Sequence, residues 1–308
     1  MDKVNKKFWT RGRKRVLFYT LILALPVIHF LIFYVYINFN SIIMAFQSYK
    51  AKPSSTGYDI AFAGFDNFVA VFDRLKTQPW LFTNSLWHYL ISLCVSMPLS
   101  LFLSFYLYKK APFSGLFKVI LFIPGVVSGV VFVLLYKYIV TDVWIALFDT
   151  KSGLLGMGAD TKLWTTIFYN FWVGLGGHFL LYSGGMSNIN ESIVESAKLD
   201  GANTFQEMLH ITLPMIYPTI VTFIVIEMSS LFVNQRNLYT FFQEGAEELS
   251  TLGYVLFVQT LHGDLIVDNP KWMSYSELTA LGLMMTAVLM PLTLGIKKIL
   301  EKVGPSVD

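Results

Sequence analysis

Six apolar stretches, each about as long as a bilayer is thick, constrain this chain more than any other feature. The hydrocarbon core of a membrane needs roughly 20 consecutive apolar residues in helical form. Hydrophobic residues make up 55% of the chain and charged residues 14%, whereas soluble domains carry about 25% charged residues. We therefore predict an all-α membrane protein with six transmembrane helices, at Leu17–Phe39, Ser85–Tyr108, Phe117–Ile139, Trp164–Gly184, Met215–Val233 and Leu278–Ile296.

The distribution of lysine and arginine predicts the orientation of these spans. Short cytoplasmic segments retain an excess of Lys and Arg. Residues 1–16 contain seven Lys and Arg residues. The other segments that are predicted on the same side of the membrane as the N-terminus contain seven more, in and around Lys109–Ser114, at Lys198 and after Ile296. The longer loops on the other side also hold seven in total. Both termini are predicted to be cytoplasmic, with a basic segment at 1–16, a permeation domain at 17–300 and a tail at 301–308.

Two other readings of the basic residues are disfavoured. A cleaved signal peptide would have an apolar core of 7–15 residues and a small-residue cleavage site, and the first stretch is longer and lacks a clear site. Nucleic-acid binding would gather the basic residues in one patch, and here they mark membrane sides. Cys94 is the only cysteine, so an intrachain disulfide and a cysteine metal cluster are excluded.

The inner loop at 186–214 predicts two short helices separated by a glycine. Asn190 can cap the first helix, and Gly201 can end it in the left-handed conformation that glycine adopts at little cost. Thr204 and Glu207 have the spacing of a capping box for the second helix. Pro214 suits the first turn of the following span.

The charges of this loop favour a protein partner over the lipid surface. A helix that lies on a membrane usually has a polar face rich in Lys and Arg. Here Lys198 is the only basic residue among four acidic ones, Glu191, Glu195, Asp200 and Glu207. Anionic lipids of the inner leaflet would repel such a helix pair.

The same loop resembles a motif of the membrane subunits of binding-protein-dependent ABC importers. That motif reads E-A-A, three residues, G, nine residues, I, one residue, L-P, in the inner loop before the penultimate span. Glu195, Ala197, Gly201, Ile211 and the Leu213-Pro214 pair match it at full spacing. Ser196 stands where the motif has its first alanine, and both of these residues are small.

Further segments resemble the maltose-transporter type of sugar permease, specifically the first of its two paired subunits. These are the outer-loop stretch Phe62–Phe68, Asn84-Ser85-Leu86, Phe122-Ile123-Pro124 and Asp200-Gly201-Ala202 with Gln206. Many relatives carry Gly-Gly-Pro after the fifth span, where this chain has Gln243–Ala246. The resemblance therefore indicates a family and does not single out one substrate.

The resemblance implies a transport subunit that is not itself an enzyme. The expected partners are a second homologous permease subunit, two cytoplasmic ATPase subunits, an extracellular or periplasmic solute-binding protein and membrane lipid, in the plasma or inner membrane. ATP and Mg²⁺ would bind to the ATPase, because this chain has no G-x-x-x-x-G-K-[ST] loop, and no cofactor or metal is expected here. The residues implied in ATPase coupling are Glu195, Ser196, Ala197, Asp200, Gly201, Ile211, Leu213 and Pro214.

Polar residues inside the spans are the candidates for a substrate path, since such residues are costly in lipid and often functional. Glu227, Ser230 and Asn234 follow one side of the fifth span at i, i+3 and i+7. Asn170 and Trp172 of the fourth span could hydrogen-bond to a sugar and stack on it, and His178 is a weaker candidate. The alternative role for all of them is interhelical packing, which Gly174, Gly177 and Gly184 suggest for part of the fourth span.

The substrate remains open between several classes at this point. No Lys or Arg lies in the middle of a span, which disfavours phosphorylated substrates and favours neutral sugars. Glu227 could instead neutralise a cationic solute such as a polyamine. A channel or secondary transporter would show inverted repeats, broken helices or filter rings, none of which the sequence indicates.

Overall fold

The computed structural model describes residues 11–52, 57–267, 269 and 271–305, and most of them are helical. Residues 1–10 of the predicted basic segment, residues 53–56 and the end of the predicted tail lie outside this described part. The chain divides into two compact units. One holds the described residues up to Val71 together with Gly263–Leu283, and the other holds Phe72–His262 with the residues from Met284 onward.

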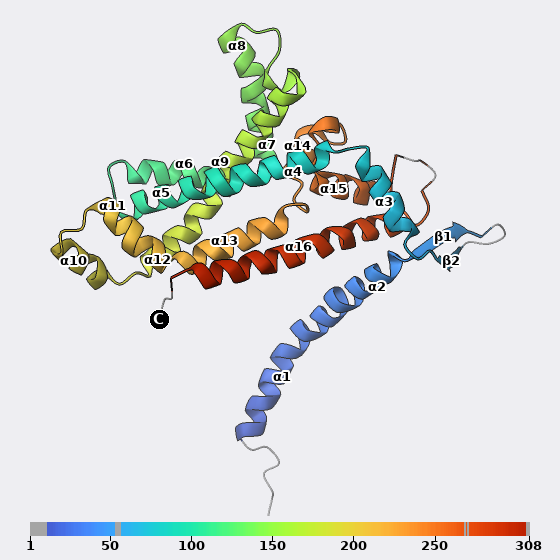
Figure 1. Cartoon of the computed structure of the whole chain (residues 1–308), viewed down its shortest axis with the longest axis horizontal. Coiled ribbons are helices and arrows are strands. Elements are labelled where there is room, and N and C mark those ends of the chain that lie inside the picture. The colour runs from blue at the N-terminus through green and yellow to red at the C-terminus, as the bar shows by residue number, and fades with distance from the viewer. Residues whose placement is uncertain (1–10, 53–56, 268, 270, 306–308) are drawn as a thin grey trace, which may run out of the picture. The chain divides into compact units, whose positions relative to one another are not determined.

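The first unit begins with a long helix whose apolar side chains are exposed all round. It consists of α1 (Arg11–His29), a π-helical segment (Phe30–Tyr36) and α2 (Ile37–Met44), as Figure 1 shows. None of the apolar window in Lys14–Met44 is buried. A helix that is hydrophobic on every side needs an apolar environment, so lipid is its expected surrounding.

A short hairpin follows that helix. Strands β1 (Gln47–Ala51) and β2 (Tyr58–Phe62) pair antiparallel, with Gln47 opposite Phe62. The side-chain amide of Asn67 donates to the carbonyls of Ala45 and Gln47 at 2.8 and 2.9 Å. This amide ties the start of α3 (Asp66–Lys76) to the base of the hairpin.

The second unit is organised around two long helices. One consists of α4 (Trp80–Ile91), a π-helical segment (Ser92–Ser96) and α5 (Met97–Tyr108), and the other is α9 (Ala159–Ser187). Hydroxyls of Ser96, Ser100 and Ser104, spaced four residues apart, reach the carbonyls of Phe171, Leu175 and Phe179 on α9 at 3.3–3.4 Å. Small residues at this spacing let two membrane helices approach closely.

Helix α6 (Ser114–Val126) packs against both α9 and α5. A Cβ atom added to Gly176 would lie 2.3 Å from the Leu121 carbonyl oxygen, so the two backbones nearly touch. The turn that joins α5 to α6 is as tight as the sequence predicts, with Lys110 and Phe113 both at positive φ.

The prediction of one continuous span at Phe117–Ile139 is wrong. Helix α6 ends at Val126, Val127 and Ser128 have extended ψ values near 143° and 129°, and α7 (Gly129–Tyr138) starts afterwards. Pro124 removes one helical hydrogen bond, and the glycines around the break have low helix propensity. A π-helical segment (Ile139–Val143), α8 (Trp144–Phe148) and a 3₁₀ turn (Leu154–Gly156) then lead to α9 (Figure 1).

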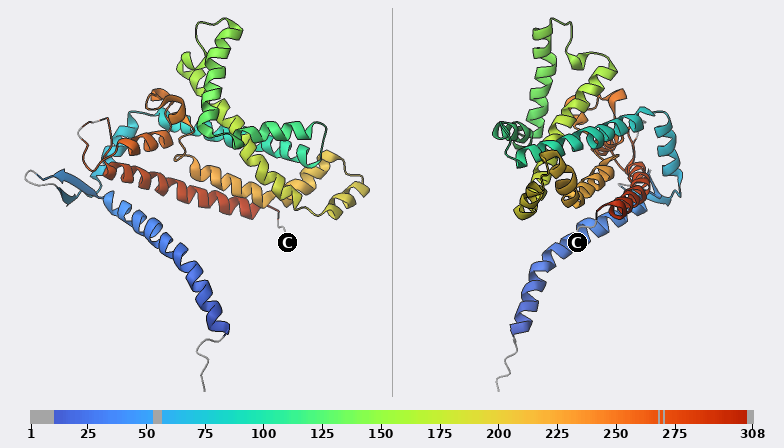
Figure 2. Two further views of the ribbon diagram at one scale, coloured as in Figure 1. Left: turned by 180° about the vertical axis from the view of Figure 1, so that it is seen from behind. Right: turned by 60° about the vertical axis from the view of Figure 1, so that its left-hand side comes forward.

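The C-terminal half of the second unit begins with the inner loop. It contains α10 (Glu191–Leu199), α11 (Thr204–Glu207), a π-helical segment (Met208–Thr212) and α12 (Leu213–Met215). Helix α13 (Tyr217–Ser230) is bent by 67° from the preceding helix. Next come α14 (Leu238–Phe242), a 3₁₀ turn (Glu247–Leu249) and α15 (Leu252–His262). The last helix is α16 (Tyr275–Val303), whose residues up to Leu283 belong to the first unit; two further views show the same order (Figure 2).

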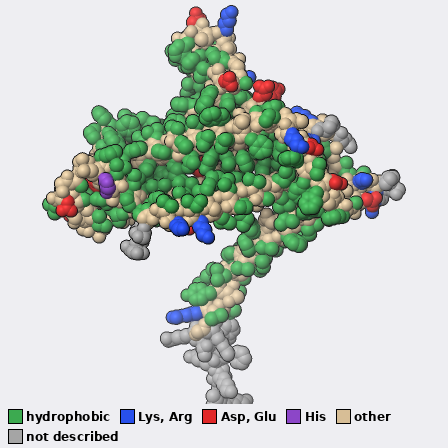
Figure 3. Space-filling view, in the orientation of Figure 1, with side chains coloured by type: hydrophobic (Ala, Val, Ile, Leu, Met, Phe, Trp, Pro, Cys, Tyr) green, Lys and Arg blue, Asp and Glu red, His purple; other side chains and the backbone are tan. Residues whose placement is uncertain are grey.

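Four helices in the described residues are long and apolar enough to cross a membrane, or five if the bent pair counts as one span. They are Lys14–Met44, Trp80–Tyr108, Gly129–Phe148 and Tyr275–Val303, with Thr204–Met215 and Tyr217–Ser230 as the pair. The predicted span at Trp164–Gly184 lies inside α9, which is not among them. Apolar side chains cover much of the visible surface of the helices (Figure 3), as expected for helices that face lipid.

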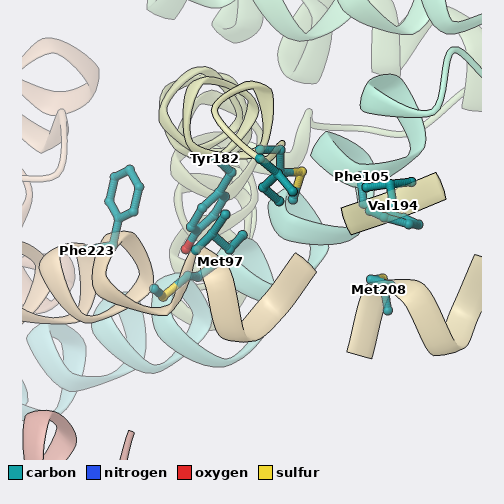
Figure 4. Packing of buried hydrophobic residues seen from close by; sticks show 9 residues of the cluster. Met97, Phe105, Tyr182, Val194, Met208 and Phe223 are labelled. Atoms are coloured by element: carbon teal, nitrogen blue, oxygen red, sulfur yellow. The ribbon is translucent and has the colours of Figure 1, made fainter. Parts of the chain in front are cut away.

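A core cluster of the second unit joins the helix bundle to the inner loop. It contains Met97, Phe105, Tyr182, Met186, Ile189, Val194, Met208, Ile216 and Phe223, of which six are labelled in Figure 4. Because Val194 and Met208 belong to the loop and most of the others to the bundle, burial of this cluster fixes the loop to the transmembrane helices.

Candidate functional site

The first helix of the inner loop begins and ends where its sequence predicts. The Asn190 side chain accepts a hydrogen bond from the Ser192 amide at 3.1 Å, which caps α10. Gly201 has φ +83°, a left-handed conformation that most residues avoid. The Ala202 amide donates to the Ala197 carbonyl at 2.9 Å and closes the C-terminal turn.

The second helix begins one residue earlier than predicted. Its capping box uses Asn203 and Gln206, not Thr204 and Glu207, and both reciprocal hydrogen bonds measure 2.9 Å. Asparagine is at least as good a cap as threonine, and Gln closes the box as well as Glu. The Glu207 side chain is consequently free to turn inward, where it is 3% exposed.

Glu207 forms an ion pair with Lys109, which lies in the turn between α5 and α6. This contact joins the inner loop to a turn that is far from it in the sequence. Together with the buried side chains of Ile189, Val194 and Met208, it connects the loop to the bundle on two sides. We therefore expect the loop and the helices of the bundle to move together as one rigid body.

The residues predicted to couple to an ATPase divide into two groups. Glu195, Ser196, Asp200 and Gly201 are exposed, whereas Ala197, Ile211, Leu213 and Pro214 are partly buried. Two large apolar side chains of the loop are also exposed, Leu199 at 89% and Phe205 at 61%. The outer side of the loop thus combines carboxylates with exposed apolar groups, a composition that suits a protein partner.

A cavity of about 680 Å³ lies between this loop and the α5–α6 turn. Lys109, Lys110 and Lys118 line it from the turn and α6, and Glu191, Glu195 and Lys198 line it from α10. The cavity is therefore polar on both sides, with most of its basic groups opposite its acidic groups.

A second polar group of residues lies inside the bundle and centres on Glu227 of α13. The Glu227 carboxylate is 3.6 Å from His178 Nε2 of α9 and 3.4 Å from an Nη atom of Arg236. The Ser92 hydroxyl is also within hydrogen-bonding range. Side chains from α9, from the π-helical segment Ser92–Ser96 and from the turn after α13 therefore surround one carboxylate on α13.

Arg236 is the residue that sequence reasoning missed. It follows α13 in a turn where Arg236 and Asn237 both have positive φ, 52° and 59°. Its side chain is 11% exposed and folds back toward Glu227. The fold therefore places a buried cation beside the fifth span, whereas the sequence has no Lys or Arg in the middle of a predicted span. The signal in the sequence is an arginine within a short Asn-rich turn, nine residues after an intramembrane glutamate.

Asn170 holds this turn in place. Its side-chain amide donates to the carbonyls of Thr166 and Arg236, both at 2.9 Å, and its oxygen accepts from Asn237 at 2.9 Å. Both the amide nitrogen and the amide oxygen of the Asn170 side chain are therefore hydrogen-bonded within the protein. Trp172 packs elsewhere, 5.2 Å from the ring of Phe132 between ring centroids.

The predicted helical stripe does not extend as far as expected. Helix α13 ends at Ser230, so Asn234 is in the turn and not on the helix face. The Ser230 hydroxyl donates to the Glu227 carbonyl oxygen, and the Asn234 side chain accepts from the Arg236 amide at 2.8 Å. Glu227 and Ser230 keep the predicted helical spacing on α13, whereas Asn234 lies near them only through the fold of the turn. In the described residues no group of three or more His, Cys, Asp or Glu could hold a metal ion.

Residues 82–307 match the family model of the binding-protein-dependent transport system inner membrane component. The arabinooligosaccharides transport system permease protein of Bacillus subtilis (strain 168) is 28% identical over 243 residues, 74% of each chain. The galactooligosaccharides transport system permease protein of the same organism is 27% identical over 65% of this chain and 51% of its own.

A solved structure shares the fold. It is that of a bacterial ABC transporter involved in the import of the acidic polysaccharide alginate, 20% identical, with a TM-score of 0.72 over 95% of this chain and 98% of the other. The family match and the apolar helices together identify a multi-pass protein of the cell membrane.

Proposed function

The chain belongs to the binding-protein-dependent transport system inner membrane components, and from this premise we propose that it is one of two permease subunits of an ATP-driven oligosaccharide importer. The two Bacillus subtilis relatives named above are permease proteins of transport systems for arabinooligosaccharides and galactooligosaccharides. The second permease subunit, two ATPases and an extracellular binding protein complete the proposed assembly. ATP and Mg²⁺ would be bound by the ATPases alone.

The proposed topology has six spans and cytoplasmic termini. The excess of lysine and arginine on the N-terminal side supports this orientation, and α9 would serve as the fourth span although it is less apolar than the others. A less apolar helix is tolerated where protein covers it, and α5, α6 and α13 pack on α9.

The observation that carries the proposal is the shape and anchoring of the α10–α11 loop. Its exposed side chains include Glu195, Leu199 and Phe205, while Val194 and Met208 fix the loop in the bundle core. An ATPase that binds these exposed side chains would therefore move the transmembrane helices when it closes on ATP. In this account Glu195 makes a polar contact with the ATPase, and Gly201 sets the angle between the two helices.

The substrate path is proposed to pass the Glu227 turn, with Ser230 and Asn234 beside it. A cationic substrate such as a polyamine would be favoured only if no other group balanced the negative charge of Glu227. Because Arg236 lies 3.4 Å from this carboxylate, the charge is already matched within the chain. A neutral, polyhydroxylated substrate fits this arrangement better.

The test is uptake by the complete transporter. Proteoliposomes that contain this chain with its second permease, ATPases and binding protein should accumulate labelled arabinotriose or galactotriose when ATP is supplied to the ATPase side. Labelled spermidine serves as the competing probe. Uptake of spermidine without uptake of either trisaccharide would refute the sugar assignment.

A further inference from the structure

The polar residues around Glu227 form a cluster inside an otherwise apolar part of the second unit. It comprises Glu227, the Arg236 guanidinium, His178 and Ser92. Ser92 lies close to the middle of the Trp80–Tyr108 helix, and Glu227 lies about 15 Å along α13 from the first residue of that helix, Tyr217. These positions indicate that the cluster lies well inside the membrane, where ionisable groups are costly and often mark a transport path.

The two full charges in this cluster compensate each other. Glu227 and Arg236 are 15% and 11% exposed, and they lie 3.4 Å apart. His178 Nε2 lies 3.6 Å from the other carboxylate oxygen. The Glu227 carboxylate and the Arg236 guanidinium therefore cancel each other's charge within one site.

Several polar atoms close to the cluster have no hydrogen-bond partner within the described part of the chain. They are His178 Nδ1, Tyr182 Oη, Gln235 Oε1 and His88 Nε2. His88 and Tyr182 lie close enough to interact electrostatically with Arg236 and Glu227, respectively. Unpaired polar atoms in such a place are costly, and an occupant that both donates and accepts hydrogen bonds would satisfy them. Sugar hydroxyl groups and water do both.

We propose that Arg236 and Glu227 set the charge preference of the substrate path, so that it accepts uncharged polyhydroxylated segments and disfavours carboxylate or ammonium groups. This inference rests on the proposed function, since it names the class of oligosaccharide carried. The ion pair offers a sugar both donors and acceptors without a net charge. An acidic sugar would instead place an unmatched carboxylate beside Glu227, and a cationic solute would place an unmatched charge beside Arg236.

Thiol labelling measures this preference without knowledge of the sugar. The reporter is Ser230→Cys in a Cys94→Ala chain, because Ser230 is one helical turn after Glu227 and a cysteine nearly matches a serine in size. The complete transporter is treated in membranes with two reagents of similar size, the anionic sulfonatoethyl and the cationic trimethylammonioethyl methanethiosulfonate. The ratio of their rates, divided by the same ratio for a free thiol in solution, reports the local potential.

Single neutralisations should shift this ratio in opposite directions. Glu227→Gln leaves Arg236 unmatched and should raise the anionic-to-cationic ratio at least about tenfold, while Arg236→Gln should lower it by a similar factor. Arg236→Lys keeps the charge and should stay near the parent ratio. The double variant Glu227→Gln/Arg236→Gln restores neutrality, so its return to the parent ratio separates charge from misfolding.

Two results would overturn the proposal. Ratios that stay within about twofold of the parent in both single variants would mean that the pair does not set the potential at the path. Complete protection of the introduced thiol from both reagents, with and without ATP, would mean that the cluster does not face water. The proposed function has a separate readout: shifted ratios in a transporter that carries no oligosaccharide would refute the sugar assignment and leave the charge preference standing.

Discussion

Lys109 and Glu207 form a buried ion pair between the α5–α6 turn and the inner loop. The two side chains are 20% and 3% exposed. The pair lies on the side of the loop opposite its exposed outer face and connects two segments that are otherwise joined through α9. This position makes the ion pair a mechanical link between the proposed ATPase contact and the helix bundle.

We predict that Glu207→Gln and Lys109→Met each destabilise the protein. Removal of one partner leaves the other as an uncompensated buried charge, which reduces stability by about 3–5 kcal/mol. The measurement is thermal unfolding of the purified chain in detergent. Lys118→Met is the matched control, because Lys118 lines the same cavity but is exposed, and it should leave the unfolding temperature nearly unchanged.

The double variant Lys109→Met/Glu207→Leu removes both charges and should recover most of the lost stability. Substrate-stimulated ATP hydrolysis then shows whether the pair also serves coupling. Single variants as stable as the Lys118→Met control would contradict the burial of this ion pair.

Two adjacent glycines of α9 provide a second prediction. A Cβ at Gly176 would lie 2.3 Å from the Leu121 carbonyl oxygen, whereas a Cβ at Gly177 would meet nothing within 4 Å. Gly176→Ala should therefore push α6 away from α9 and destabilise the protein by about 1–3 kcal/mol. Gly177→Ala should be neutral or stabilise the helix by up to about 1 kcal/mol. Equal unfolding temperatures for the two variants would show that α6 and α9 are not in close contact.

A third prediction concerns the turn at Gly201. Its φ of +83° excludes most side chains on conformational grounds, although a Cβ there would meet nothing within 4 Å. Gly201→Val should strain the turn by about 1–2 kcal/mol and reduce substrate-stimulated ATP hydrolysis. Gly201→Asn is the control, because asparagine tolerates the left-handed region. If both variants hydrolyse ATP as the parent does, the angle between α10 and α11 has no part in coupling.

Local signals predicted the parts of this molecule that depend on a few neighbouring residues. Asn190 and Gly201 act where they were expected to act, since a cap and a left-handed turn are properties of short sequence segments. The cap of α11 was misplaced by one residue because Asn203 and Thr204 are both good caps, and Gln206 and Glu207 both complete a box. Apolar length located most spans, but it did not reveal the break after Val126, where Pro124 and Gly125 interrupt the helix.

Contacts between distant segments were beyond the reach of such reasoning. The burial of Glu207 follows from Lys109, which lies on another turn, and the position of Arg236 depends on the hydrogen bond from the Asn170 amide to the Arg236 carbonyl. Arg236 follows Val233, the last residue of a predicted span, so hydropathy alone assigns it to an outer loop. Only the folded turn shows that its side chain returns to Glu227.

The fourth prediction tests that turn directly. Asn170→Leu keeps the size of the side chain but removes its hydrogen bonds to the Arg236 carbonyl and to Asn237. Backbone amides at 234–238 should then exchange hydrogen at least about tenfold faster, since loss of these bonds amounts to about 1–3 kcal/mol. Exchange in α10, which lies in the inner loop, serves as the internal reference. Unchanged exchange at 234–238 would show that Asn170 does not hold the turn.

The central claim is that the α10–α11 loop couples an ATPase to sugar movement, and Glu195→Ala tests it most directly. The measurement is ATP hydrolysis by the complete transporter in proteoliposomes, with and without the binding protein loaded with arabinotriose or galactotriose. Glu301→Ala is the matched control, an exposed carboxylate on α16 outside the loop. We predict that Glu195→Ala inserts normally and loses the substrate-stimulated part of hydrolysis, while Glu301→Ala keeps it. Full stimulation in Glu195→Ala would contradict the account.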